Sequence, residues 1–221
     1  MKLFFSALIK FLLGPIFVGA LLFLPAGTWD YPHAWLFLLL LFVPMLLMGV
    51  ILFVKNKKLL ERRLDPKEKV GTQKGVVGFF ALIFLAGFVL SGLDFRFGWS
   101  QVPLWLVVTA SGLFLVGYGL YGEVMRENAY LSRTIEVQAG QTVVSTGLYG
   151  VVRHPMYLAT FFMFLPLPLI LGSFWGLLPF AIYPIVIVVR ILSEEKVLTE
   201  KLAGYKEYKT KVKYRLLPFI W

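Results

Sequence analysis

Long apolar runs separated by short polar segments dominate the sequence. Four runs of about 20 residues each come first, at 4–24, 34–54, 75–93 and 102–122. A run of that length allows a helix to cross the hydrocarbon core of a bilayer. Two shorter runs with internal prolines follow, at 155–172 and 175–192, and we expect them to form a short helical hairpin. The pattern predicts an all-α integral membrane protein with about six transmembrane helices.

The charged residues indicate how these helices are oriented. The segment 55–74 contains eight Lys and Arg and three acidic residues, and its "KKLLERRL" stretch is a candidate for a short interfacial helix. With the N-terminus inside, the outer loops hold only Asp30, Asp94 and Arg96, and the other basic residues lie inside. The positive-inside rule therefore predicts that both termini are cytoplasmic. We expect a multi-pass protein of a prokaryotic cell membrane, with its first apolar run retained as a helix.

Composition narrows the possible chemistry. The formal net charge is +10, but the basic residues flank apolar runs, so we expect the lipid bilayer and not a nucleic acid as the partner. The chain has no cysteine, which excludes disulfides, thiolate zinc sites and thiol catalysis. Its two histidines, His33 and His154, fall on opposite sides of the predicted membrane, so we expect no metal site.

Polar residues gather where the predicted hairpin begins and ends. Arg153 and His154 directly precede Pro155, and Arg190, Glu194 and Glu195 stand where the last apolar run leaves the membrane. Arg190 and Glu194 are four residues apart and share one helix face. A hairpin brings its two ends together in space. Ionisable groups at membrane depth are costly, so such a cluster favours a functional site.

Each of these residues also has a plain structural interpretation. Arg153 and Arg190 could each bind lipid phosphates at the end of a helix. Arg190 and Glu194 could form a weak surface ion pair. His154 could simply precede a helix that begins at proline. The alternatives remain open for each residue alone, whereas the joint occurrence favours a common site.

Three stretches in this part of the chain carry a family resemblance. They are "QTVVSTGLYGVVRHPMY" (141–157), "RILSEEKVL" (190–198) and "GYKEYKTKVKYRLLPF" (204–219). In this order and around a hairpin, they resemble the isoprenylcysteine carboxyl methyltransferase family and its relatives, which include phospholipid N-methyltransferases. The resemblance covers about residues 123–221, and the earlier runs match only as generic membrane helices.

The resemblance implies a site for S-adenosylmethionine (SAM) on the cytosolic side, under a lid formed by the C-terminal tail. The residues it implies as cofactor-binding are Gln141, Thr142, Val143, Val144, Tyr149, His154, Pro155, Met156, Tyr157 and Glu194. Arg190 would face the methyl acceptor, and Glu195 would be the candidate base for an amine acceptor. Arg153 is a third candidate catalytic residue, with its role left open.

We therefore predict a SAM-dependent methyltransferase acting on a lipophilic acceptor, with O-methylation of a carboxylate as in the isoprenylcysteine enzymes. Methylation of phospholipids or small thiols is the alternative within the superfamily. An NADPH-dependent sterol-reductase-like enzyme and a non-enzymatic transporter or scaffold are the alternatives outside it. We divide the chain into four N-terminal helices with a basic cytosolic loop (1–122) and a methyltransferase core (123–221).

Overall fold

A computed structural model of the chain describes residues 2–64, 71–132 and 135–221, and every regular element in these ranges is a helix. The N-terminal helices are α1 (Lys2–Ala26), α2 (Pro32–Lys55), α3 (Lys57–Leu64), α4 (Gly71–Phe97) and α5 (Leu104–Glu127). After a polar connection come η1 (Gly147–Gly150), α6 (Pro155–Phe164), α7 (Leu167–Ile170), α8 (Leu177–Phe180), α9 (Tyr183–Lys201) and α10 (Tyr205–Lys211). The predicted all-α fold is confirmed.

The apolar runs became helices as expected. Among the described residues, five segments are long and apolar enough to cross a membrane: Leu3–Ala26, Pro32–Lys55, Gly75–Phe97, Leu104–Glu127 and Leu177–Lys201. The run before the last one forms a shorter apolar segment, Pro155–Ile170. Prolines break this segment and the next into the pairs α6–α7 and α8–α9, because proline lacks the backbone donor that a helix interior needs.

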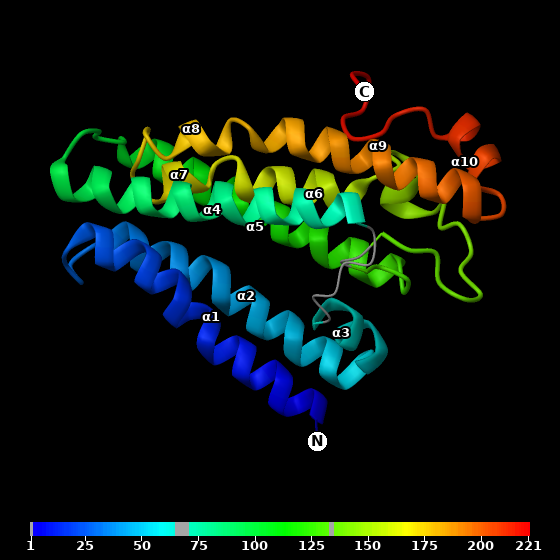
Figure 1. The fold of residues 1–221 in the computed structure, drawn as a ribbon, viewed down its shortest axis with the longest axis horizontal. Coiled ribbons are helices and arrows are strands. Elements are labelled where there is room, and N and C mark those ends of the chain that lie inside the picture. Colours follow the sequence, from blue (N-terminus) through cyan, green and yellow to red (C-terminus); the bar gives the residue numbers. More distant parts are fainter. Residues whose placement is uncertain (1, 65–70, 133–134) are drawn as a thin grey trace.

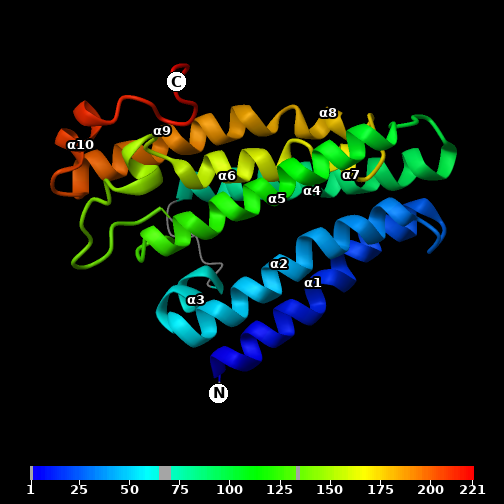
Figure 2. The same ribbon diagram turned by 180° about the vertical axis from the view of Figure 1, so that it is seen from behind.

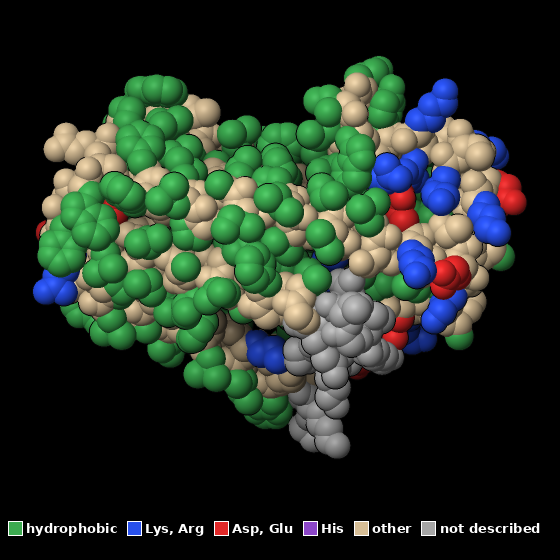
Figure 3. Space-filling view, turned by 45° about the horizontal axis from the view of Figure 1, so that its top comes forward, with side chains coloured by type: hydrophobic (Ala, Val, Ile, Leu, Met, Phe, Trp, Pro, Cys, Tyr) green, Lys and Arg blue, Asp and Glu red, His purple; other side chains and the backbone are tan. Residues whose placement is uncertain are grey.

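The helices lie along one long axis, and the molecule has two different ends (Figures 1 and 2). One end holds the connections between α1 and α2, between α4 and α5, and between α7 and α8. The other end holds α3, the polar connection and α10, and both termini lie nearer to it. Charged side chains gather around α10, whereas apolar side chains cover most of the visible flank (Figure 3).

The basic segment 55–74 is described only in part. The "KKLLERRL" stretch forms α3, as predicted, and its Leu59 and Leu60 are buried. Arg62 donates a hydrogen bond to the carbonyl oxygen of Ala129 at 2.7 Å, which fastens α3 to the polar connection after α5. Residues 65–70 of the predicted loop lie outside the described residues.

Polar side chains join the loops at the opposite end. The Tyr31 hydroxyl donates to the carbonyl oxygen of Leu171 at 2.6 Å. Asp94, expected in a loop, lies in the last turn of α4, where it is 1% exposed and accepts a hydrogen bond from the Ser100 backbone N–H at 2.8 Å. It also accepts one from the Ser173 hydroxyl. These bonds satisfy polar groups that would otherwise be buried at a cost.

Close contact between α5 and α6 places the hairpin against the rest of the bundle. A Cβ atom at Gly117 would lie only 2.8 Å from the carbonyl oxygen of Ala159, so only glycine fits there. Phe114, one turn earlier, is fully buried in the main core with Met163. In contrast, large apolar side chains such as Leu13 and Ile16 are exposed on the outer faces, where lipid would cover them.

The two ends generate a prediction about orientation. Because the chain has no native cysteine, single cysteines can report sidedness. We expect the exposed Asp30→Cys and Gln101→Cys variants to react with a membrane-impermeant maleimide in intact cells. The exposed Lys58→Cys and Lys211→Cys variants should react only after permeabilisation. Labelling of Lys58→Cys in intact cells would reverse the predicted orientation.

Candidate functional site

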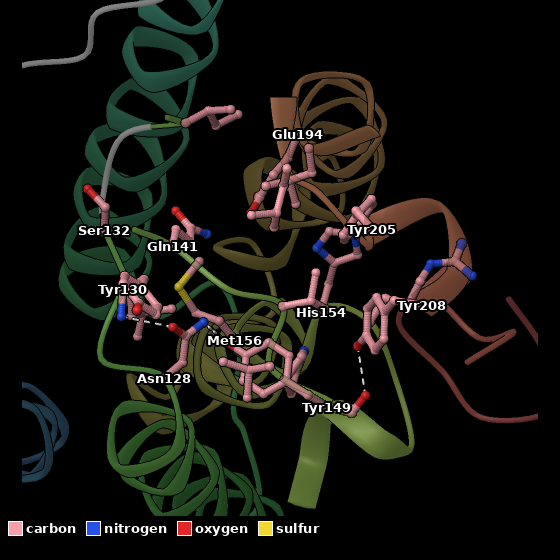
Figure 4. Close-up of a pocket in the computed structure, with 18 of the residues that line it drawn as sticks. Asn128, Tyr130, Ser132, Gln141, Tyr149, His154, Met156, Glu194, Tyr205 and Tyr208 are labelled. Atoms are coloured by element: carbon pink, nitrogen blue, oxygen red, sulfur yellow. Dashed lines mark hydrogen bonds between the residues drawn. The ribbon is translucent and has the colours of Figure 1, made fainter. Parts of the chain in front are cut away.

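A pocket of about 840 Å³, its open mouth included, lies at the charged end of the bundle. Its walls come from the polar connection after α5, from η1, from the start of α6, from the second half of α9 and from α10 (Figure 4). Small-molecule sites in proteins commonly combine apolar walls with a few placed polar groups. The pocket has this mixed lining, with polar side chains such as Gln141 and Glu194 beside apolar ones such as Val143 and Val144.

One wall depends on a glycine at the start of η1. Gly147 has a φ of 50°, and a Cβ atom there would coincide with the Glu127 carboxylate. The close approach lets Glu127 accept a hydrogen bond from the Leu148 backbone N–H at 3.1 Å. The turn that follows directs Tyr149 into the pocket, where its hydroxyl accepts a hydrogen bond from Asn128 Nδ2 at 2.8 Å. Burial raises the pKa of Tyr149.

The floor of the pocket is the start of α6. His154 is the residue before this helix, and Pro155 stands at its first position, where a missing backbone donor costs nothing. His154 is 5% exposed, and its Nε2 atom makes no hydrogen bond within the described chain. Glu195 Oε1 lies 3.4 Å from that nitrogen. His154 thus brings a buried polar atom to the pocket without a normal protein partner.

A chain of hydrogen bonds links α9 to α6. Arg190 Nε donates to the Tyr157 hydroxyl at 3.0 Å, and this hydroxyl donates to Glu194 Oε2 at 2.6 Å. Arg190 and Tyr157 are buried, and Glu194 is half-buried. All three line the pocket. The predicted pairing of Arg190 and Glu194 on one helix face is therefore mediated by a tyrosine, which fixes both side chains.

The next glutamate turns away from the pocket. Successive helix residues point about 100° apart, and Glu195 does not contribute to the lining. It is 6% exposed, and its two oxygens accept hydrogen bonds from Arg153 Nε at 2.6 Å and Arg215 Nε at 3.0 Å. Arg153 Nη1 also donates to the carbonyl oxygens of Val212 and Lys213. Glu195 is thus tied to the C-terminal tail.

The remaining wall is α10, which follows a left-handed glycine, Gly204 (φ 80°). Tyr208 donates a hydrogen bond from its hydroxyl to the carbonyl oxygen of Tyr149 at 2.7 Å. Tyr205 is 3% exposed, and its hydroxyl has no hydrogen-bond partner in the described chain. Burial raises the pKa of both phenols, and the carboxylates of Glu195 and Glu194 raise that of Tyr205 further.

The structure brings nearly all of the expected site residues together. The pocket is lined by all ten residues expected at the cofactor and by two of the expected catalytic residues: Gln141, Thr142, Val143, Val144, Tyr149, Arg153, His154, Pro155, Met156, Tyr157, Arg190 and Glu194. Glu195 stands behind this lining. The roles that the resemblance implies for these residues stay predictions.

Other lining residues were missed. They include Asn128, Tyr130, Ser132 and Glu136 after α5, Leu198 and Leu202 on α9, and Tyr205 and Tyr208 on α10. The two tyrosines form the spaced pair of the "GYKEY" stretch, which was a usable signal. The residues after α5 lie in an irregular segment with no periodicity, so no pattern could have selected them.

Comparison with known proteins agrees with this geometry. Residues 105–205 match the family model described as phospholipid methyltransferase. This family is part of a superfamily of integral membrane methyltransferases, and the matched region of the chain is similar to it. The predicted resemblance is therefore confirmed, and the match favours a membrane methyltransferase over the reductase and scaffold alternatives. The matched region begins in α5 and ends at the first residue of α10. No curated protein matches the chain.

The family match points to methyl transfer as the general activity. Methyltransferases of the phospholipid methyltransferase family generally use SAM as the methyl donor. Within the described ranges, no group of three or more His, Cys, Asp or Glu side chains could hold a metal ion.

The two α10 tyrosines provide a matched pair of variants. Tyr208→Phe removes the bond to the Tyr149 carbonyl and should destabilise the protein by about 1 kcal/mol at pH 8. Tyr205→Phe removes a hydroxyl without a protein partner and should leave the melting temperature at pH 8 nearly unchanged. Thermal unfolding in detergent measures both values. An equal loss in the two variants would show that Tyr205 has a partner in the protein.

The same pair tests the direction of the pKa shifts. The folded state holds these phenolic protons more tightly than the unfolded state, whose tyrosines have a pKa of about 10. Stability should be complete below about pH 10 and fall as the pH rises further. Each Phe variant should therefore lose less stability than the parent between pH 8 and pH 11.

Proposed function

We propose that the pocket binds SAM and that the protein transfers the methyl group to a lipophilic acceptor supplied by the bilayer. The observation that carries the proposal is that two residues lining the pocket, His154 and Tyr205, have buried polar atoms, Nε2 and Oη, without a hydrogen-bond partner in the described chain. Buried polar groups normally have partners. A polar ligand in the pocket would supply them.

The residues present fit the charged and aromatic groups of SAM. The cofactor carries a sulfonium, an ammonium and an adenosine group. Glu194 places a carboxylate in the lining, held by the Tyr157 hydroxyl, and can pair with the ammonium. Tyr149 and Tyr205 offer aromatic faces to a flat base or to a cation. Gln141 and Thr142, in the polar connection after α5, add polar groups to the lining.

Bound SAM would supply an activated methyl group. The contribution of the protein is to hold the acceptor in line, to exclude water and to balance charge. Arg190 is the side chain suited to an anionic acceptor, because a guanidinium can bind a carboxylate through two parallel hydrogen bonds. A carboxylate acceptor is already deprotonated and needs no general base.

Arg190 therefore favours a carboxylate on a lipophilic molecule as the acceptor, which is the chemistry of the isoprenylcysteine enzymes. An amine acceptor would have to lose a proton. Glu195, the expected base for that reaction, lies behind the pocket lining and is bound to two arginines. A phospholipid amine is the second candidate, and the family description of residues 105–205 favours it.

Cofactor binding gives the first test of the proposal. Calorimetry in detergent should show that the parent binds SAM and not NADPH. Glu194→Gln and His154→Ala should each weaken SAM binding by roughly tenfold to a hundredfold, the usual effect of losing a hydrogen bond to a charged group. Glu200→Gln, a change to an exposed glutamate on the same helix, is the control and should bind like the parent. Unchanged affinity in both site variants would refute the proposed binding mode.

Acceptor chemistry gives the second test. We expect labelled methyl to pass from SAM into a lipid of a total membrane extract, and mild alkali to release it if the product is a methyl ester. Alkali-stable label would point to a phospholipid amine or a thiol. Arg190→Ala should keep SAM affinity within a few-fold of the parent and lose methyl transfer. Arg190→Lys should recover only part of it, because a point charge cannot replace a bidentate fork. Full activity in Arg190→Lys would leave Arg190 no role in orienting the acceptor.

A further inference from the structure

Three distant segments of the chain meet at the Glu195 carboxylate. It lies on α9, and its hydrogen-bond partners are Arg153, just before α6, and Arg215, in the C-terminal tail. We infer that Glu195 is a positioning residue that latches the tail and thereby holds α10 as a wall of the pocket. This inference rests on the proposed function for the identity of the ligand but not for the latch itself.

We call Glu195, Arg153 and Arg215 the latch. Both side-chain and backbone hydrogen bonds hold the tail at this point. Arg153 uses Nε for Glu195 and Nη1 for the carbonyl oxygens of Val212 and Lys213, at 2.8 and 2.9 Å. The backbone adds a second connection. The N–H groups of Arg153 and His154 donate to the carbonyl oxygens of Tyr214 and Arg215, each at 2.9 Å. Side-chain and backbone bonds together therefore secure four consecutive tail residues, 212–215.

Securing these residues determines where α10 lies. This helix has only seven residues, which is too short for a helix to be stable by itself in water. The N-terminus of α10 follows Leu202, which caps the end of α9. Its C-terminus is followed at once by Val212, the first of the secured tail residues. Tyr205 and Tyr208 pack between Leu202 and Val212 in one small cluster. If the tail were released, α10 and its two tyrosines would be anchored only through the connection to α9.

Burial makes the latch sensitive to the loss of any member. Glu195 and Arg153 are 6% and 8% exposed, and removal of one partner from a buried ion pair leaves the other charge without compensation. Arg215 is about one-third exposed, so water already screens part of its charge. Loss of Glu195 should therefore release the tail more completely than loss of Arg215.

The two neighbouring glutamates thus have different roles. Glu194 faces the pocket through Tyr157, and Glu195 faces the tail through Arg153. If Glu195 instead acted as a general base, its loss would abolish methyl transfer and leave the tail and SAM affinity unchanged. A positioning role predicts the opposite order of effects, with tail exposure and cofactor affinity changing first.

A cysteine reporter tests the latch in the full-length protein. Leu216→Cys places the only thiol of the chain at a tail position that is 5% exposed. In detergent, we expect Glu195→Gln to speed its reaction with a polar maleimide at least tenfold and to weaken SAM binding about tenfold. Arg215→Ala, the milder variant, should speed labelling less. Glu200→Gln should change neither quantity.

A second reporter separates local release from general loosening. Leu59→Cys, on α3 at the same end of the molecule and 1% exposed, should label at the parental rate in every variant. Equal acceleration at positions 59 and 216 would overturn the inference, because Glu195 would then only support the fold. Unchanged labelling at position 216 in Glu195→Gln would overturn it too. If the parent fails to bind SAM while Glu195→Gln still exposes position 216, the proposed function fails and the latch stands.

Discussion

The buried ion pair between Glu195 and Arg153 is the interaction on which the site depends. An isolated carboxylate at this depth would be costly, and its attraction to a guanidinium at 2.6 Å offsets that cost only because the geometry is good and further hydrogen bonds satisfy the remaining donors. The carbonyl oxygens of the tail provide those bonds. A single constraint therefore requires the start of α6, the last turns of α9 and the tail to lie together, and the pocket is the space that they enclose.

The position of this cluster relates to the two environments that the protein is built for, the bilayer and water. The long apolar helices α5 and α9 and the shorter apolar α6 are suited to a bilayer, whereas charged side chains gather around α10. The hydrogen-bonded row of Arg190, Tyr157 and Glu194 lies where these regions meet. A polar cofactor can approach such a boundary from water and a greasy acceptor can approach it from lipid, so neither needs to cross the environment of the other.

Much of this arrangement could be predicted from the sequence. Apolar runs of spanning length leave few alternatives to helices, because a bilayer satisfies no backbone groups. The hairpin followed from two short runs with prolines, and its ends had to place Arg153 and His154 near Arg190 and Glu194. The α3 helix could be predicted because leucines and pairs of basic residues are interspersed in "KKLLERRL".

Other features depend on tertiary contacts that leave no mark on the sequence pattern. Glu194 and Glu195 are identical side chains on one helix, and only the positions of Tyr157 and Arg153 decide which one faces the pocket. Asn128 and Tyr130 lie in an irregular segment whose path is set by side-chain bonds such as the one from Gln138 to the Tyr130 carbonyl. Asp94 looked like a loop residue and instead completes a helix, because serines from two other segments satisfy it.

The short length of the segment 155–170 has a consequence for the depth of the pocket. At about 1.5 Å per residue it covers roughly 24 Å, less than the roughly 30 Å of a typical hydrocarbon core. Pro155 and Met156 at its start line the pocket floor, so a segment that reaches the far edge of the core would place this floor below the level of the headgroups. Moving one methylene from lipid into water costs about 0.8 kcal/mol, or roughly 12 kcal/mol for a fifteen-carbon chain. A floor at that depth would spare the proposed lipophilic acceptor that extraction, because only its polar end would have to rise while its hydrocarbon tail stayed among the acyl chains.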